Sequence, residues 1–359
     1  MPKRSTNADS RHPTYAAIDL GTNNCRMLVA CPAKNGGRNN TRNGLRVIDG
    51  FSRIVRLGEG VRATGRLADA AIERTTEALK ICAAKINNRG VKETRAIATQ
   101  ACRQAENGAA FLEHVRRETG LGMKTISAAE EAELTLAGCA PLLGTGHPRT
   151  LMFDIGGGST ELIWVDNRPD NRGGNRAGNG PGQKNSKPHG RPKALDVLSL
   201  PIGVVGLAEE FGEGALAPDD LETIVERIDE ALAPFEDRHG IAAEIEAGNV
   251  HMLGTSGTLT TMGAIYLDLP RYDRARVDGL SIRWESIDAI CARLVGLDYQ
   301  ARRDHPCIGP GRADLMVMGC AVLTAICRRW PAPHLTAADR GIREGLLLDM
   351  MAADSVAAS

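Results

Sequence analysis

Two glycine-rich segments, each with an aspartate at the end of an apolar run, constrain this chain more than any other feature. The first reads AAIDLGTNN over residues 16–24, and the second reads LMFDIGGGSTE over residues 151–161. Each predicts a strand that ends in a tight turn, where glycine lets backbone N–H groups approach phosphate closely. The adjacent Asp19 and Asp154 can hold a metal ion directly or through water. One such turn is a weak signal, but two indicate a duplicated fold with phosphate between its halves.

Length and composition favour a two-domain protein, because 359 residues exceed one ordinary domain. No apolar stretch reaches the length of a transmembrane helix, and the polar residues 1–13 lack the apolar core of a signal peptide. We therefore expect a cytoplasmic protein with a disordered tail over residues 1–13. The nine cysteines form no CxxC and the eight histidines form no HExxH, which favours reduced, buried thiols over a zinc site.

Predicted strands alternate with predicted helices along the chain, which indicates the α/β class. Strands are expected within residues 14–30 and 45–57, and at 93–98, 125–126, 162–165, 195–200, 250–253 and 334–337. Helices are expected at 69–90, from an Asn107 cap to 120, from 127 onward, and at 218–236, 285–296, 312–328 and 341–351.

Positive charge is unevenly distributed, although the net charge of the chain is zero. Residues 167–193 consist largely of Gly, Asn, Pro, Lys and Arg, so we interpret them as a disordered basic insertion in a hairpin. The insertion is either a tolerated solvated loop or an electrostatic tether for RNA or polyphosphate. The remaining body is acidic, so nucleic acid is not an expected partner and a polyanionic substrate would need arginines focused in a cleft.

A series of segments makes about residues 14–350 resemble the exopolyphosphatase/guanosine pentaphosphate phosphatase (Ppx/GppA) family, within the superfamily of acetate and sugar kinases, heat-shock ATPases and actin. The resemblance implies two actin-like (ribonuclease H-like) domains around an interdomain cleft, without the extra C-terminal helical domains of longer members. Domain I would comprise residues 14–136 and 337–355, and domain II residues 137–336. The segments are AIDLGTNNCRMLVA (17–30), RLGEGV (56–61), ATQACRQAENG (98–108), ISAAEEAEL (126–134), FDIGGGSTELI (153–163), SLPIGVVGL (199–207), LGTSGTLTT (253–261), GPGRADLMVMG (309–319) and ADRGIREGLLLD (338–349).

A candidate catalytic base lies at the start of the helix expected from residue 127. Ser127 and Glu130 match a capping box, which gives Glu130 a structural task. Glu131 points about 100° further around the helix and is not explained by the cap. Alone, this pattern also suits a surface glutamate, but the resemblance implies that Glu131 activates the attacking water. Glu133 is expected to be solvated.

Metal and phosphate ligands are also expected. Asp154 and Glu161 are candidate Mg²⁺ ligands, and Asp19 is the symmetry-related partner that touches the metal through water. The alternative for Glu161 is an outward-facing strand residue. Arg103 matches the substrate-facing arginine of the family, although a salt bridge at a helix start is the alternative. The expected phosphate-binding residues in the three turns are Gly21, Thr22, Asn23, Asn24, Gly156, Gly157, Gly158, Ser159, Gly254, Thr255, Ser256 and Gly257.

Three further arginines are weaker candidates for the substrate site. Arg56 and Arg312 could contact phosphate, whereas Arg340, beside Asp339, is expected in a structural ion pair at a domain contact. Two departures from the commoner family pattern leave the substrate preference open. They are Thr22-Asn23-Asn24 and Gln100-Ala101-Cys102.

The resemblance implies Mg²⁺-dependent hydrolysis of the terminal phosphoanhydride of inorganic polyphosphate, with release of orthophosphate. Guanosine pentaphosphate (pppGpp) is the close alternative, because both substrates end in a phosphoanhydride and the catalytic residues cannot separate them. An ATP-dependent sugar or acetate kinase and a non-catalytic regulator that binds an alarmone or polyphosphate are the alternatives from other classes. A homodimer is compatible with the family, and no membrane partner is expected.

Overall fold

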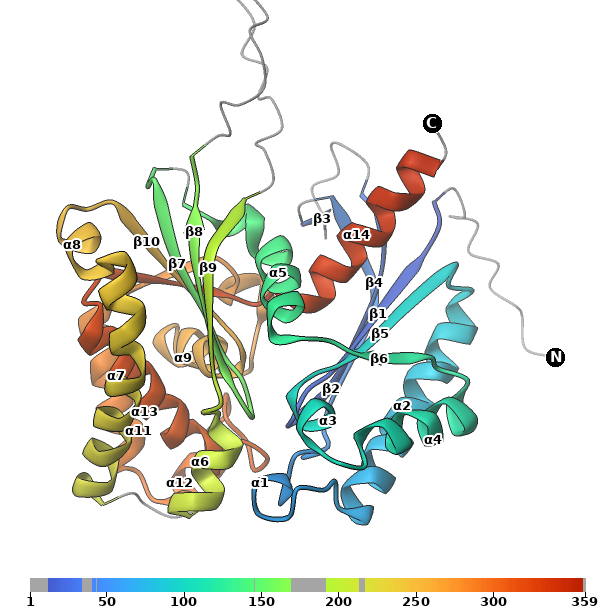
Figure 1. Cartoon of the computed structure of the whole chain (residues 1–359), viewed down its shortest axis with the longest axis horizontal. Helices are drawn as coiled ribbons and strands as arrows, with labels where there is room; N and C mark the ends of the chain where they lie inside the picture. Colours follow the sequence, from blue (N-terminus) through green and yellow to red (C-terminus); the bar gives the residue numbers. More distant parts are fainter. Residues whose placement is uncertain are drawn as a thin grey trace, which may run out of the picture.

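Two six-stranded mixed sheets lie side by side, each with helices packed on it (Figure 1). Their strand orders are β3-β4-β2-β1-β5-β6 and β11-β12-β10-β7-β8-β9. This arrangement confirms the α/β class and the two-domain expectation. The computed structural model describes residues 12–33, 41–42, 44–144, 146–168, 192–212 and 217–357. Most of the expected disordered tail and of the basic insertion lies outside the described residues.

Helices cover both faces of the first sheet. Alternate residues of its strands point to opposite faces, and the apolar residues on each face pack against helices. Ala16 and Ile18 of β1 join the cluster that packs under α2, whereas Tyr15 and Ala17 pack against α14 on the other face. The elements of this half are β1 (Tyr15–Leu20), β2 (Asn24–Pro32), β3 (Thr41–Arg42), β4 (Leu45–Ile54), α1 (Val61–Thr64), α2 (Asp69–Arg89), β5 (Glu93–Ala98), α3 (Gln100–Gln104), α4 (Gly108–Thr119) and β6 (Met123–Thr125).

The second sheet carries the largest apolar core, in which Phe153, Trp164 and Trp330 are almost fully buried. Its strands and following helices are β7 (Arg149–Ile155), β8 (Thr160–Asp166), β9 (Lys193–Leu200), α6 (Val204–Phe211), α7 (Pro218–His239), α8 (Ile241–Glu246), β10 (Val250–Thr255), α9 (Gly257–Tyr266), α10 (Arg274–Val277), β11 (Leu280–Arg283), α11 (Trp284–Gly296), α12 (Tyr299–Asp304), α13 (Ala313–Arg329) and β12 (His334–Ala338).

Helices α5 (Ala128–Cys139) and α14 (Ile342–Ala357) cross between the two sheets (Figure 1). A short 3₁₀ turn, η1 (Ala140–Leu142), leads from α5 toward the second sheet. The two helix backbones touch at glycines: a Cβ at Gly138 would lie 2.0 Å from the Gly341 carbonyl oxygen, and one at Gly345 would lie 2.1 Å from that of Leu134. No side chain fits there. The close contact of α5 and α14 at these glycines therefore fixes how the two helices pack where they connect the two halves.

Most expected elements are confirmed to within a few residues. Strands β8 and β9 pair antiparallel, as predicted for the hairpin that carries the basic insertion. All nine cysteines are buried and free. Asn107 and Gly120 flank α4 as its N-cap and C-cap residues, as predicted, but the Asn107 side-chain amide bonds to both backbone polar groups of Leu67 and makes no cap hydrogen bond. The unanticipated elements include α6, α9 and β11, besides several shorter ones.

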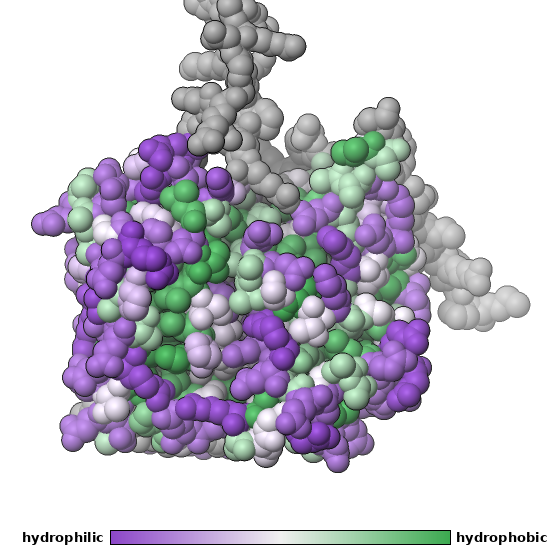
Figure 2. All heavy atoms as spheres, viewed as in Figure 1, coloured by the Kyte–Doolittle hydropathy of each residue, from purple (hydrophilic) through white to green (hydrophobic). Residues whose placement is uncertain are grey.

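The face of the molecule in Figure 2 is mostly hydrophilic, with smaller hydrophobic areas between the polar ones. Such scattered apolar exposure is ordinary for a folded chain. Within the described ranges, no helix combines the length and apolar character required to cross a membrane.

One half-buried histidine in the second sheet, His251, makes the stability of the fold depend on pH. The Nδ1 atom of His251 accepts the Gly144 N–H at 3.0 Å, and its Nε2 lies 2.8 Å from the Thr336 hydroxyl. Burial, and then the neighbouring His147, lowers the pKa of His251 from 6.5 to about 4. The folded protein therefore holds the neutral ring at pH values where the unfolded chain is already protonated.

We expect the free energy of unfolding to fall by up to about 3 kcal/mol as pH falls from about 6.5 to about 4. The reason is that His251 takes up a proton in this pH range only in the unfolded state. Urea unfolding of wild type and His251→Gln at both ends of the window measures this loss. The variant should lose less stability with acid than wild type. The exposed His334→Gln is the control, and an equal acid loss in wild type and His251→Gln would contradict the prediction.

Candidate active site

A cavity of about 640 Å³ lies between the two sheets, and all three glycine turns contribute to its wall. Gly21 to Asn24, Gly156 to Ser159, and Thr255 to Gly257 line it, together with Asp19, Glu131 and Asp154. Segments that are far apart in the sequence therefore meet here. Gly254 is the exception among the expected turn residues, because it faces Phe153 and Leu259 inside the second sheet.

The first turn joins β1 to β2 and is tied down through its backbone. The Gly21 N–H donates to the Asn24 carbonyl at 2.9 Å, and the carbonyls of Thr22 and Asn23 accept from the segment at residues 55–58. Thr22 and Asn23 are buried. The Oδ1 atom of Asn23 has no hydrogen-bond partner among the described residues. The backbone of the turn is thus held by several hydrogen bonds, while Asn23 Oδ1 remains available to a ligand.

The second turn joins β7 to β8 and is braced by the start of α6. Gly156 N–H donates to the Ser159 carbonyl at 2.8 Å, and the N–H groups of Val204 and Val205 donate to the carbonyls of Gly156 and Gly157. Among the described residues, no hydrogen bond uses the N–H groups of Gly157 or Gly158. Two neighbouring free N–H groups in a fixed turn form a site for an anion.

The third turn joins β10 to α9 and carries two arginines beside it. A Cβ built at Gly257 would lie 3.8 Å from Nη2 of Arg26 and 3.9 Å from Nη1 of Arg312. Burial and the nearby Arg26 lower the pKa of the Arg312 guanidinium. Two like charges held together beside a helix start favour an anionic ligand. Ser256, at this start, has a φ of 95° and a buried hydroxyl without a partner in the described part of the chain.

Arg26 is one of the charged cavity residues that the sequence did not predict, as are Arg274 and Arg343. It lies in β2 opposite Asp19 of β1 in the sheet register. The sequence signal that could have identified it is the position of Arg26 in an otherwise apolar strand, directly after the first turn. Arg312, a weaker candidate, lines the cavity, whereas Arg56 forms an ion pair of 2.9 Å with the buried Asp314.

Glu131 occupies the position on α5 that the capping argument singled out. Ser127 and Glu130 form the predicted capping box, with Ser127 N–H to Glu130 Oε2 at 2.9 Å and Glu130 N–H to Ser127 Oγ at 3.2 Å. Glu131 is buried at the cavity wall, with 9 % of the residue exposed, whereas Glu133 is exposed as expected. Nη1 of Arg103 lies 3.5 Å from Glu131 Oε2.

Arg103 does not line the cavity. Its Nη1 donates to the Ile126 carbonyl at 2.7 Å, immediately before the α5 cap, as well as facing Glu131. Arg103 thus links the segment after β6 to the candidate base Glu131. These two contacts form a salt bridge next to the start of α5, which was the alternative for Arg103. Contact between Arg103 and a substrate stays a prediction.

The buried Glu161 and the half-buried Asp19 and Asp154 complete a group of carboxylates with Glu131. Asp154 and Glu161 lie opposite each other in the β7–β8 pair. Glu161 is buried rather than outward-facing, and its Oε1 accepts the Ser199 hydroxyl at 2.9 Å. It lies behind the residues that line the cavity, which include Asp19 and Asp154.

Burial and mutual repulsion act on the ionisation of these acids. Burial, and then Glu161, Asp19 and Asp154, raises the pKa of Glu131 to about 9. Burial, followed by Glu161, raises the pKa of Asp154 to about 7, and burial raises the pKa of Asp19 and of Glu161. Carboxylates that disfavour one another's charge create a site that a cation would stabilise.

The acids fit a magnesium ion that keeps ligands from outside the protein. Among the described residues, no group of three or more His, Cys, Asp or Glu side chains is arranged to hold a metal. Magnesium usually binds one or two carboxylates and completes its shell with water and substrate phosphate. The pair Asp154 and Glu161, with Asp19 nearby, suits that mode.

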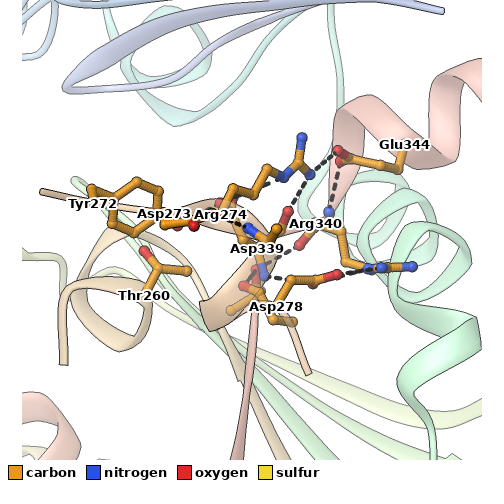
Figure 3. Close-up of polar contacts among 12 residues, drawn as sticks. Thr260, Tyr272, Asp273, Arg274, Asp278, Asp339, Arg340 and Glu344 are labelled. Atoms are coloured by element: carbon orange, nitrogen blue, oxygen red, sulfur yellow. Dashed lines mark hydrogen bonds and ion pairs between the residues drawn. The ribbon is translucent and has the colours of Figure 1, made fainter. Parts of the chain in front are cut away.

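A polar network contributes further residues to the cavity wall (Figure 3). The Tyr272 hydroxyl and the Arg274 guanidinium both contact Asp339, and Arg274 also bonds to Glu344 at 2.5 Å. Arg340 is in a structural ion pair, as expected, but its partner is Asp278 rather than the adjacent Asp339. Both side chains of that pair are almost completely buried.

Comparison with known proteins places these features in context. The sequence pattern of the Ppx/GppA phosphatase family matches residues 38–354. The chain is 29% identical to Exopolyphosphatase 2 of Mycobacterium tuberculosis over 93% of this chain and 98% of that protein. Its structure is similar to that of the Aquifex aeolicus PPX-GPPA enzyme, with a TM-score of 0.71, 26% identity, and coverage of 94% of this chain and 99% of the other.

A second solved structure supports the fold. An exopolyphosphatase from Cytophaga hutchinsonii superimposes with a TM-score of 0.77 at 21% identity, covering 95% of this chain and 98% of the other. Both similarities extend over nearly the whole chain.

Proposed function

The chain belongs to the Ppx/GppA phosphatase family, a family of hydrolases that act on phosphoanhydrides, and on this premise we propose that it is a Mg²⁺-dependent exopolyphosphatase. The reaction is hydrolysis of the terminal phosphoanhydride of inorganic polyphosphate, with release of orthophosphate. The observation that carries the proposal is the single cavity in which three glycine turns meet Glu131 and the neighbouring aspartates.

The turns bind and orient the terminal phosphoryl group. The unused N–H groups of Gly157 and Gly158 donate to its oxygens, and Arg26 and Arg312 neutralise the phosphates that follow. Fixed donors of this kind stabilise charge in the transition state without reorganising. The chain of phosphates is thereby held with its last phosphorus facing α5.

Glu131 orients the attacking water and accepts one of its protons. The water oxygen bonds to the terminal phosphorus, and the bridging P–O bond breaks with its electron pair on the shortened chain. Asp154 and Glu161, with Asp19 nearby, would hold Mg²⁺, which supplies charge neutralisation on the phosphates when bound. Positive charge in the cavity also favours the ionised form of Glu131, the form that a base requires.

Guanosine pentaphosphate is the second candidate substrate, and one feature of the cavity favours it. Beyond the phosphate turns, the wall includes Tyr272, Leu315 and Met316, which offer aromatic and apolar contacts for a nucleoside. Polyphosphate has no group that uses such contacts.

Phosphate release from long-chain polyphosphate and from guanosine pentaphosphate tests the proposal. With Mg²⁺ we expect release from polyphosphate, and chelation should lower it by at least about 100-fold, because the metal offsets charge on the phosphates. Readdition of Mg²⁺ should restore the rate, which serves as the control for unfolding. Faster release from guanosine pentaphosphate would select the nucleotide substrate.

Two other outcomes would contradict a hydrolase mechanism. Phosphate transfer from ATP to an acceptor, without release from polyphosphate, would indicate a kinase. Tight binding of either substrate without turnover would indicate a regulator.

A further inference from the structure

We propose that Gln100 is a water-positioning residue that acts together with Glu131, an inference that rests on the hydrolytic function proposed above. Gln100 begins α3, at the C-terminal end of β5, and lines the cavity with Asp19 and Glu131. The same short helix carries Arg103, which lies 3.5 Å from the Glu131 carboxylate. One element of the first half thus supplies two groups around the candidate base.

The Gln100 side chain reaches across the cavity to the second half of the protein. A Cβ built at Gly158 would lie only 2.1 Å from Gln100 Oε1 and 2.7 Å from Thr22 Oγ1. Gly158 belongs to the second turn, in which no hydrogen bond among the described residues uses the N–H groups of Gly157 and Gly158. The Gln100 amide therefore lies against the place where the turn would hold a phosphoryl group.

The Oε1 atom of Gln100 is buried and has no hydrogen-bond partner among the described residues. A buried acceptor without a donor costs free energy, so an O–H or N–H group from a ligand would stabilise it. Asn23 Oδ1, on the adjacent first turn, is unpartnered in the same way. A ligand at this position would satisfy both kinds of unused group, the N–H donors of the turn and the amide acceptors of the first half.

The chemistry of the reaction limits what that ligand can be. The terminal phosphoryl group of an ionised polyphosphate has only acceptor oxygens, which suit the Gly157 and Gly158 N–H groups but not an amide carbonyl oxygen. The attacking water has two O–H donors. Glu131 takes one of them, and Gln100 Oε1 is suited to accept the other. An amide that orients a nucleophilic water is a known device in phosphoryl transfer.

The balance of the step follows. The water oxygen attacks the terminal phosphorus, one proton passes to Glu131, and the bridging oxygen leaves on the shortened chain with the electron pair of the broken bond. The second proton stays on the new orthophosphate as its P–OH group, still bonded to Gln100. Gln100 thus recognises the O–H of the water and then of the product.

This role predicts a preference that can be measured without turnover. Orthophosphate at mildly alkaline pH carries a P–OH group, whereas fluorophosphate has the same charge and a similar size but no O–H. In the presence of Mg²⁺, wild type should bind orthophosphate about tenfold more tightly than fluorophosphate by titration calorimetry. Gln100→Met, which keeps the length of the side chain, should bind the two anions equally.

The same variant should lower kcat for polyphosphate by roughly 10- to 100-fold, with little change in KM, because the lost contact is to the water rather than to the phosphate chain. Gln100→Ala should have the same effect and provides a second folded variant. The matched control is Gln104→Met, an exposed glutamine on the same helix, which should retain both the anion preference and kcat.

Retention of the orthophosphate preference in both Gln100 variants would overturn the proposal, and so would an equal loss of affinity for both anions. Failure of the wild type to release phosphate from either substrate would refute the proposed function. The anion-binding comparison would still test Gln100 in that case, so the two failures are distinguishable.

Discussion

Glu131→Gln is expected to lower phosphate release by about 10²- to 10⁴-fold, because the amide cannot accept a proton from the attacking water. Glu131 is buried at the cavity wall beside the glycine turns, and its carboxylate faces Arg103. Glutamine keeps the size of the side chain, so packing should be preserved. Steady-state phosphate release from polyphosphate with Mg²⁺ measures the effect.

The control for this prediction is Glu133→Gln, two residues further along α5 and exposed. It changes the net charge of the helix by the same amount but should leave the rate unchanged. Thermal unfolding of both variants should resemble that of wild type. A Glu131→Gln protein that keeps more than about a tenth of the wild-type rate would rule out a base at this position.

Asp278→Asn is expected to destabilise the protein by roughly 3–5 kcal/mol, because it leaves the Arg340 guanidinium buried without a compensating charge. The side chains of this ion pair are 3% and 7% exposed, respectively. Asp278 also accepts the Asp339 N–H at 3.0 Å, so the carboxylate organises the segment that enters α14. Urea unfolding, followed by circular dichroism, gives the free energy of unfolding.

The matched control is Glu285→Gln, which removes the partner of Arg283 from a pair whose side chains are 68% and 69% exposed. Solvent screens such a pair, so its loss should cost less than about 1 kcal/mol. Similar costs for the two substitutions would mean that burial does not govern the contribution of the Arg340 pair. Because Arg340 also lines the cavity, phosphate release should weaken in Asp278→Asn as well.

The sequence predicted the elements whose signals are local. The apolar runs that form β1 and β2, the Ser127–Glu130 capping box and the helix that ends at Gly90 each depend on neighbours within one element, and the structure confirms them. Helices α6 and α9 were not predicted, since they follow glycine turns and consist of apolar or threonine-rich residues. Those sequences also suit a buried strand, and tertiary packing selects the helix.

The candidate site was predicted in its parts but not in its geometry. Sequence identified the three turns and the acids, whereas Arg26 was missed because its role depends on the turn at Gly257, far away in the chain. Arg103 and Glu161 lie behind the cavity wall rather than on it. Their catalytic and metal-binding roles, and the boundaries of the two domains, stay predictions.

By itself, the sequence determined the α/β class, the family, the two strand–turn segments and the acid that the capping box leaves unexplained, because each of these is written in short runs of residues. Only the tertiary structure decided which charges meet. It paired Arg340 with Asp278, brought Glu131 beside Asp19 and Asp154, and raised the pKa of Glu131 to about 9. Burial and charge–charge distance are properties of the packed chain, since residues remote in sequence create both.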